Sequence, residues 1–116
     1  MRDDDFYVEG GVLRIAGQII NTGLRVVQAI RAGGRIIVRL EPPPSSTRND
    51  NVACYDNQGK LLWTIQASPH GGTSYNPYML VYINSNLLVC AQNWNGVEYQ
   101  INIGDGTVSA IGLQRF

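Results

Sequence analysis

Short runs of alternating apolar and polar residues, separated by turns rich in glycine and asparagine, make up most of the chain. Alternation with a period of two places apolar side chains on one face of a β-strand, so each run predicts a strand. Because short turns join neighbouring runs, the pattern predicts an all-β antiparallel meander of about ten short strands. The runs lie at residues 12–15, 18–20, 24–31, 35–41, 51–55, 60–66, 78–83, 87–92, 97–103 and 108–110.

The segment 24–31 is ambiguous, since Leu24, Val27 and Arg31 have helical spacing whereas its β-branched residues prefer a strand. Pairing with the next run favours the strand: a three-residue loop at 32–34 separates an apolar face from an arginine-rich one. A one-residue slip would turn every side chain over, so the pattern selects this register. The apolar set is Val26, Gln28, Ile30, Ile36, Val38 and Leu40; the opposite set is Arg25, Val27, Ala29, Arg31, Arg35, Ile37, Arg39 and Glu41.

Turn residues separate the remaining strands. The proline-rich segment 42–50 cannot continue a ladder of hydrogen bonds and is expected to be a loop. Tight turns are expected at Asp56–Gly59, Asn84–Asn86, Asn93–Gly96 and Asp105–Gly106. Each of them connects two consecutive strands, which predicts consecutive hairpins.

Length and composition fit one domain spanning residues 1–116, with 44% hydrophobic and 16% charged residues. The longest apolar run, Tyr78–Ile83, is too short to cross a membrane. The acidic segment 1–9 is expected to be frayed, and no secretory pattern follows Met1, so we expect a cytoplasmic location.

Residues 51–65 resemble the strand–turn–strand unit of quinoprotein-type β-propeller repeats: a small apolar strand, Asp, a polar turn, Gly-Lys and an aliphatic-Trp strand. The chain also resembles a group of small bacterial proteins of unknown function, through residues 34–38, 42–44, 56–63 and 93–96. Some bacterial proteins of this appearance are immunity-type partners of toxins. The resemblance therefore implies propeller-blade-like hairpins and a protein-binding role.

A weak internal repeat supports the same architecture, because two hairpins align on Gly59 and Gly96 with a spacing of 37 residues. About ten short strands make little more than two blades, and a propeller needs about four to close. We therefore expect a barrel or sandwich and exclude a closed monomeric propeller. A propeller fragment completed by self-association is the remaining alternative.

Charge is unevenly distributed although the net charge is zero. Residues 1–9 hold a charge of −3, residues 10–48 hold +5, and the rest holds −2. Arg31, Arg35 and Arg39 project from the arginine-rich face, either as a binding surface for an acidic protein or as a solvated sheet face. Nucleic acid is the less favoured partner, because no aromatic side chains alternate with these arginines.

The two cysteines fit no zinc or redox spacing, and both are expected to be reduced and buried. Cys54 should face Trp63, and Cys90 should lie with Tyr99. We expect neither a metal nor a cofactor, since one histidine and two core cysteines do not supply a usual ligand set.

The sequence shows no catalytic motif, and the chain is expected not to be an enzyme. His70 is the sole histidine, and its Ser-Pro-His-Gly-Gly loop does not match a nucleophile elbow. Trp94 lies in a tight turn between two asparagines, where it either contacts a ligand or caps the core.

These features favour a non-catalytic protein-binding module that uses Arg31, Arg35, Arg39 and Trp94, either as a monomer or as a homo-oligomer. The alternative is a lectin-like module that binds sugars through turn aromatics such as Trp94, in an oligomer.

Overall fold

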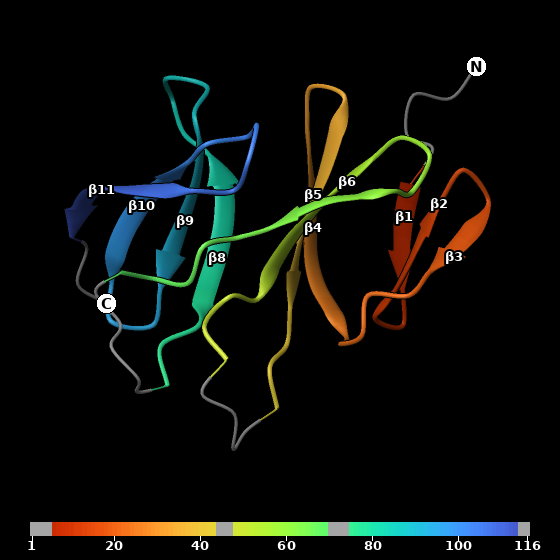
Figure 1. The fold of residues 1–116 in the computed structure, drawn as a ribbon, viewed down its shortest axis with the longest axis horizontal. Helices are drawn as coiled ribbons and strands as arrows, with labels where there is room; N and C mark the ends of the chain where they lie inside the picture. Colours follow the sequence, from red (N-terminus) through yellow and green to blue (C-terminus); the bar gives the residue numbers. More distant parts are fainter. Residues whose placement is uncertain (1–5, 44–47, 70–74, 114–116) are drawn as a thin grey trace.

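The computed structural model describes residues 6–43, 48–69 and 75–113. Within these ranges the protein has no helix, and eleven strands form three antiparallel sheets (Figure 1). The all-β class and the succession of hairpins are thereby confirmed. None of the sheets closes into a barrel, so the packed-sheet alternative is the one observed.

Each sheet is a meander in which chain order is also strand order. Sheet A holds β1 (Phe6–Glu9), β2 (Val12–Ile15) and β3 (Gln18–Ile20). Sheet B holds β4 (Val26–Ala32), β5 (Arg35–Leu40), β6 (Val52–Asp56) and β7 (Leu61–Thr64). Sheet C holds β8 (Tyr78–Ile83), β9 (Val89–Asn93), β10 (Val97–Ile101) and β11 (Val108–Leu113).

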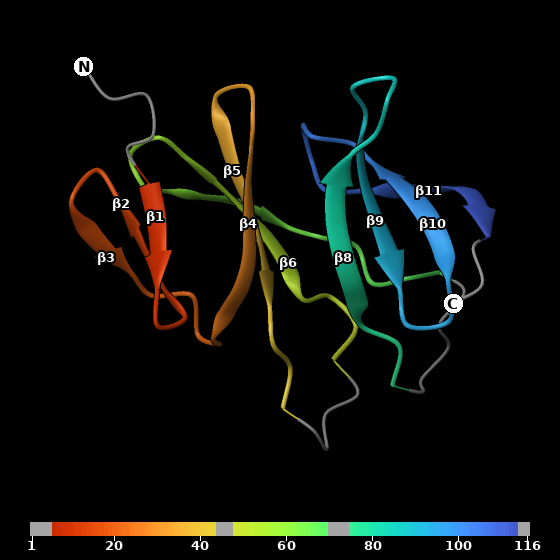
Figure 2. The ribbon, with the colours of Figure 1, turned by 180° about the vertical axis from the view of Figure 1, so that it is seen from behind.

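Sheet B lies between sheets A and C, and both of its faces are buried (Figures 1 and 2). One core cluster joins sheet B to sheet A and includes the fully buried Leu13, Ile15 and Ile36. The other joins sheet B to sheet C and includes Trp63 and Tyr99. The first strand of sheet B, β4, lies next to the first strands of the other two sheets, β1 and β8.

The N-terminal part of the chain departs from expectation. Residues 6–9, expected to be frayed, form strand β1. Phe6 pairs with Ile15 and packs against the buried cluster between sheets A and B, which accounts for the order of this segment. Residues 1–5 lie outside the described part of the chain. In the proline-rich segment, 42–43 and 48–50 are loop as expected, and 44–47 are not described.

The predicted register of the β4–β5 hairpin is wrong. Ala32 pairs with Arg35, so the turn has two residues, and Gly33 supplies the positive φ of 62° that it requires. Arg31 consequently lies opposite Ile36 rather than Arg35. The apolar pattern did not select the register because sheet B is buried on both faces.

Two other hairpins have longer loops than expected. Ile83 pairs with Val89 across a five-residue connection, and Ile101, rather than Ile103, pairs with Val108. In the second hairpin, a hydrogen bond from Asn102 N–H to the carbonyl of Thr107, at 2.8 Å, closes the loop directly after Ile101, so Ile103 lies within the loop.

Buried amides join the sheets at the end where β8 begins. The Asn51 side chain donates to the carbonyls of Leu40 and Tyr78, each at 2.9 Å, and accepts from Tyr78 N–H at 2.8 Å. Asn93 Nδ2 donates to Ser68 Oγ at 2.6 Å. Buried hydrogen bonds of this kind fix the relative position of the elements they connect.

Candidate functional site

The three arginines expected to form one surface do not share a face of sheet B. Arg35 and Arg39 lie on the side of Ile37, whereas Arg31 lies on the side of Ile36. The pairing observed in the β4–β5 hairpin is the reason, because the two-residue turn moves Arg31 to the opposite face.

Arg35 and Arg39 point into the seam between sheets B and C. Arg35 Nη1 donates to the carbonyl of Ile103, and Arg39 Nε donates to Gln28 Oε1 at 3.0 Å. Burial lowers the pKa of Arg39, and the neighbouring Glu41 opposes that shift. Both side chains are half-buried and bind groups of this same chain.

Arg31 is engaged between sheet B and sheet A. Its guanidinium carbon lies 5.2 Å from the ring centroid of Phe6, and Nη1 donates to Asn57 Oδ1 at 2.9 Å. The three arginines thus hold together different parts of the fold. Whether any of them also binds a partner stays a prediction.

Trp94, the fourth expected site residue, is exposed instead of capping the core. Its side chain is 56% accessible, and the neighbouring Tyr75 is 39% accessible. The two rings meet edge to face, with centroids 5.8 Å apart and an interplanar angle of 67°. We call Tyr75 and Trp94 the aromatic pair.

The backbone around the aromatic pair is held by hydrogen bonds. Trp94 N–H donates to the carbonyl of Pro77 at 2.8 Å, which ties the β9–β10 turn to the start of β8. Asn93 Oδ1 accepts from Val97 N–H at 2.9 Å and closes the turn. Asn95 N–H donates to Asn76 Oδ1 at 3.1 Å. An exposed pair on a pre-organised turn loses little conformational freedom on binding.

One polar atom beside the aromatic pair has no hydrogen-bond partner among the described residues. Asn76 is 3% accessible, and its Nδ2 is buried without an acceptor. Buried donors are usually paired, so this amide is a further unusual feature of the same turn region.

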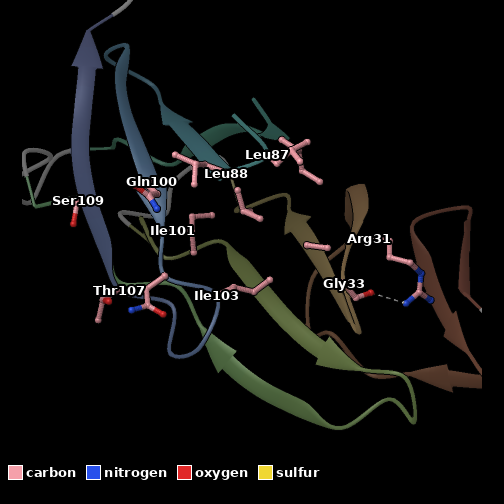
Figure 3. Close-up of a pocket in the computed structure, with 13 residues that line it drawn as sticks. Arg31, Gly33, Leu87, Leu88, Gln100, Ile101, Ile103, Thr107 and Ser109 are labelled. Atoms are coloured by element: carbon pink, nitrogen blue, oxygen red, sulfur yellow. Dashed lines mark hydrogen bonds between the residues drawn. The ribbon is translucent and has the colours of Figure 1, made fainter. Parts of the chain in front are cut away.

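A second feature lies at the other end of sheets B and C. An open groove of about 640 Å³ runs between the β4–β5 turn and the loops that precede β9 and β11. Figure 3 shows Leu87 and Leu88 on one side and Arg31 and Gly33 on the other. The aliphatic Ile101 and Ile103 also line the groove.

Leu87 has an unusual backbone for a leucine, with a φ of 63°, and its side chain is 81% exposed. Left-handed conformations cost a residue with a Cβ about 1–2 kcal/mol. Asn84 supports this turn, because its Oδ1 accepts from Asn86 N–H and Leu88 N–H at 2.9 and 3.0 Å. The β8–β9 turn therefore exposes the apolar side chain of Leu87, although the backbone conformation of Leu87 is unfavourable.

The groups considered for catalysis are placed apart from one another or outside the described residues. Ser68 Oγ lies 2.7 Å from Tyr99 Oη within the buried network. Asp56 caps its own turn by accepting from Lys60 and Gln58 N–H, and these hydrogen bonds lower its pKa. His70 lies outside the described residues. The described ranges bring together no three His, Cys, Asp or Glu side chains able to hold a metal ion.

The cysteines are free and buried, as expected. Cys54 pairs with Trp63, as expected from the hairpin. The expected placement of Cys90 is wrong: Cys90 pairs with Gln100, while Tyr99 pairs with Ala91. Cys90 therefore lies on the face of sheet C away from sheet B, because the β9–β10 register differs by one residue from the predicted one.

Sequence reasoning missed Tyr75 and Asn76. Both precede β8, and they are brought beside Trp94 by the pairing of Tyr78 with Asn93 and by the hydrogen bonds of Pro77 and Asn76 to the β9–β10 turn. The available signal was two aromatic residues, Tyr75 and Trp94, each next to asparagine at the ends of strands that were predicted to pair.

A family model described as a domain of unknown function, DUF7957, matches residues 4–113. No curated protein matches the chain, and no solved structure does. Among the described residues, no helix is long and apolar enough to cross a membrane.

Proposed function

The chain belongs to the DUF7957 family, and we propose that it is a non-catalytic protein-binding module whose main contact is the aromatic pair. The observation that supports this proposal is the 56% exposure of Trp94 on a turn fixed by hydrogen bonds. Tryptophan and tyrosine are enriched among the residues that dominate binding energy at protein interfaces. Large aromatics otherwise bury most of their surface.

The aromatic pair, and not the three arginines, is the proposed contact surface. Arg35 and Arg39 bind the carbonyl of Ile103 and the side chain of Gln28, so they are already used within the fold. An acidic partner is therefore no longer favoured over a neutral one. The bacterial origin, the cytoplasmic location and an immunity-type role remain proposals suggested by the sequence resemblance.

The test is affinity capture from the source cell with the wild-type protein, the Tyr75→Ala/Trp94→Ala double variant and a matched control. Leu61→Ala is the control, since Leu61 is 51% exposed and lies on β7, away from the aromatic pair. We expect a partner that is captured by wild type and control and is lost with the double variant at unchanged melting temperature. Equal capture by all three proteins would contradict the proposal.

A second candidate function, sugar binding, is favoured by the exposed side chain of Asn95, which follows Trp94 in the same turn. An amide next to an aromatic face offers a hydrogen bond and an apolar platform, which suits the polar edge and apolar face of a sugar ring. A glycan array distinguishes the two functions. Binding to one class of glycan that Trp94→Ala abolishes would favour the lectin-like function.

A further inference from the structure

The two outer sheets each leave one face uncovered. Sheets A and C pack on opposite faces of sheet B, and no other described sheet covers their far faces (Figures 1 and 2). Stacked β-units bury a continuous core only where each has a neighbour on both sides. The row of three sheets is therefore open at both ends.

The shape of the row is that of half a ring. Strand β4 lies next to β1 and β8 along one side, and the later strands of each sheet spread away from these three (Figure 2). This is the arrangement of consecutive blades around a propeller axis. The molecule measures 41 Å by 35 Å by 24 Å. Its longest and shortest dimensions correspond to the width and depth of a disc cut in half, which is about twice as wide as it is deep. Two copies would supply six blades, within the usual range of about four to eight.

The uncovered face of sheet A carries exposed apolar side chains and two charges of opposite sign, Arg14 and Glu9. Glu9 lies two residues after Tyr7 on β1 and therefore shares its face. Strand pairing places Tyr7, Arg14 and Ile19 in one row across this face. Tyr7 is 51% exposed and Ile19 is 62% exposed. Arg14 makes no ion pair with any side chain in the described ranges.

The uncovered face of sheet C carries a negative charge, Glu98. Pairing places Leu80, Gln92 and Glu98 in one row across it, and Leu80 is 41% exposed. Glu98 also forms no ion pair within the part of the chain that the structure describes. Arg14 and Glu98 are therefore opposite charges on the two faces, and each face presents at least one exposed apolar side chain.

We propose that two copies of this chain close into a six-bladed ring, in which sheet A of each copy packs on sheet C of the other. Arg14 of each protomer pairs with Glu98 of the partner subunit. A two-fold axis relates the copies, so both contacts form together and leave no open end. This proposal concerns the ends of the row and does not rest on the aromatic pair, which lies at the β9–β10 turn and in the segment just before β8.

The first measurement is the mass of the full chain in solution by light scattering or sedimentation, from about 1 to 100 μM, a range that covers micromolar dissociation constants. We expect a species of twice the chain mass that dissociates on dilution. A monomer throughout, or a series of larger species, would overturn the proposal.

The second measurement uses charge reversal. Arg14→Glu places two carboxylates together at both contacts, and Glu98→Arg places two cations together. We expect each variant alone to raise the dimer dissociation constant at least about tenfold, because like charges across an interface are unfavourable. An equimolar mixture of the two variants should recover the dimer, since a mixed dimer has one native contact and one reversed but complementary contact.

If either residue had only a structural role within its own protomer, mixing the two variants would not recover the dimer. Dimers of both single variants as tight as wild type, or no recovery on mixing, would overturn the proposal. Circular dichroism checks that each variant folds; if one does not, Arg14→Gln and Glu98→Gln replace the reversals and should each weaken the dimer. The Tyr75→Ala/Trp94→Ala protein should remain dimeric, so failure of this proposal and failure of the proposed function are distinguishable.

Discussion

The side chain of Gln28 in β4 forms hydrogen bonds with both backbone groups of Val81 in β8. Its Nε2 donates to the Val81 carbonyl at 2.6 Å, and its Oε1 accepts from Val81 N–H at 3.1 Å. The amide thus takes the position that a neighbouring strand would occupy and links sheets B and C across 53 residues of sequence. Arg39 Nε donates to the same Oε1, which gives a polar junction in the middle of two apolar sheets.

Gln28→Ala should lower the free energy of unfolding by about 1–3 kcal/mol, because it leaves the carbonyl and N–H of Val81 without partners in a partly buried seam. Denaturant unfolding measures this loss. Gln58→Ala is the matched control, since Gln58 is exposed and only its backbone N–H is hydrogen-bonded. Equal stability of the two variants would contradict a role for the Gln28 amide in joining the sheets.

The two tryptophans should respond very differently to truncation. Trp63 is 8% exposed, and its Nε1 donates to the carbonyl of Ile103 at 2.8 Å, so Trp63→Ala should cost about 3–5 kcal/mol. Trp94→Ala should cost less than about 1 kcal/mol, because the ring is mostly exposed. Chemical unfolding curves of both variants provide the test. A large loss at Trp94 would mean that this ring supports the core.

Gly106 is required by both conformation and space. Its φ is +82°, and a Cβ there would lie 2.5 Å from Cε3 of Trp63. Gly33 has a φ of +62° but nothing within 4 Å, so Gly33→Ala isolates the conformational cost of about 1–2 kcal/mol. Gly106→Ala should lower the melting temperature clearly more than Gly33→Ala. Equal shifts would show that the contact with Trp63 relaxes without cost.

Stability should fall in mildly alkaline solution. Burial raises the pKa of the Cys54 thiol to about 11, although Arg35 partly opposes the shift. Below about pH 8.5, the ordinary thiol pKa, the thiol is neutral in both states. As the pH rises above that value, the unfolded chain loses the proton while the folded chain keeps it until about pH 11, so the free energy of unfolding decreases. Burial also raises the pKa of Cys90, Tyr55 and Tyr78, which adds to the same trend.

Unfolding titrations between pH 7 and 10 measure this decrease. Cys54→Ala/Cys90→Ala should be less stable at pH 7 but should show a shallower fall with pH. In the wild-type protein, thiol labelling should be slow in native buffer and fast in denaturant. Rapid labelling of both thiols in native buffer would contradict their burial.

Local features of the fold were predictable from sequence, and the placement of sheets was not. The turn at Asp56–Gly59 follows from its composition, and Gly59 has the expected positive φ of 90°. The pairing of Cys54 with Trp63 follows from that turn. Both depend on residues fewer than ten positions apart.

The β4–β5 register was not predictable from apolar alternation because Ile36 and Ile37, which point to opposite faces, are both fully buried. Alternation identifies a face only where the other one meets water. The expectation that the three arginines share one face was wrong for the same reason, and the partner of Arg35, Ile103, lies 68 residues away in the chain. Of the candidate site, the turn position of Trp94 was predictable, whereas the contact with Tyr75 depends on how β8 and β9 pair.

Arg35 and Arg39 hold sheets B and C together, which leaves the aromatic pair as the exposed contact. The decisive measurement is the free energy of unfolding of Arg35→Glu/Arg39→Glu, compared with that of Arg48→Glu/Lys60→Glu, which changes the charge equally at two exposed positions. We predict a loss of about 2–5 kcal/mol for the first variant, because the carbonyl of Ile103 and Oε1 of Gln28 each lose a charged donor. The second variant should change by less than about 1 kcal/mol. Equal stability of the two variants would contradict the claim and return the arginines to the surface as a binding face.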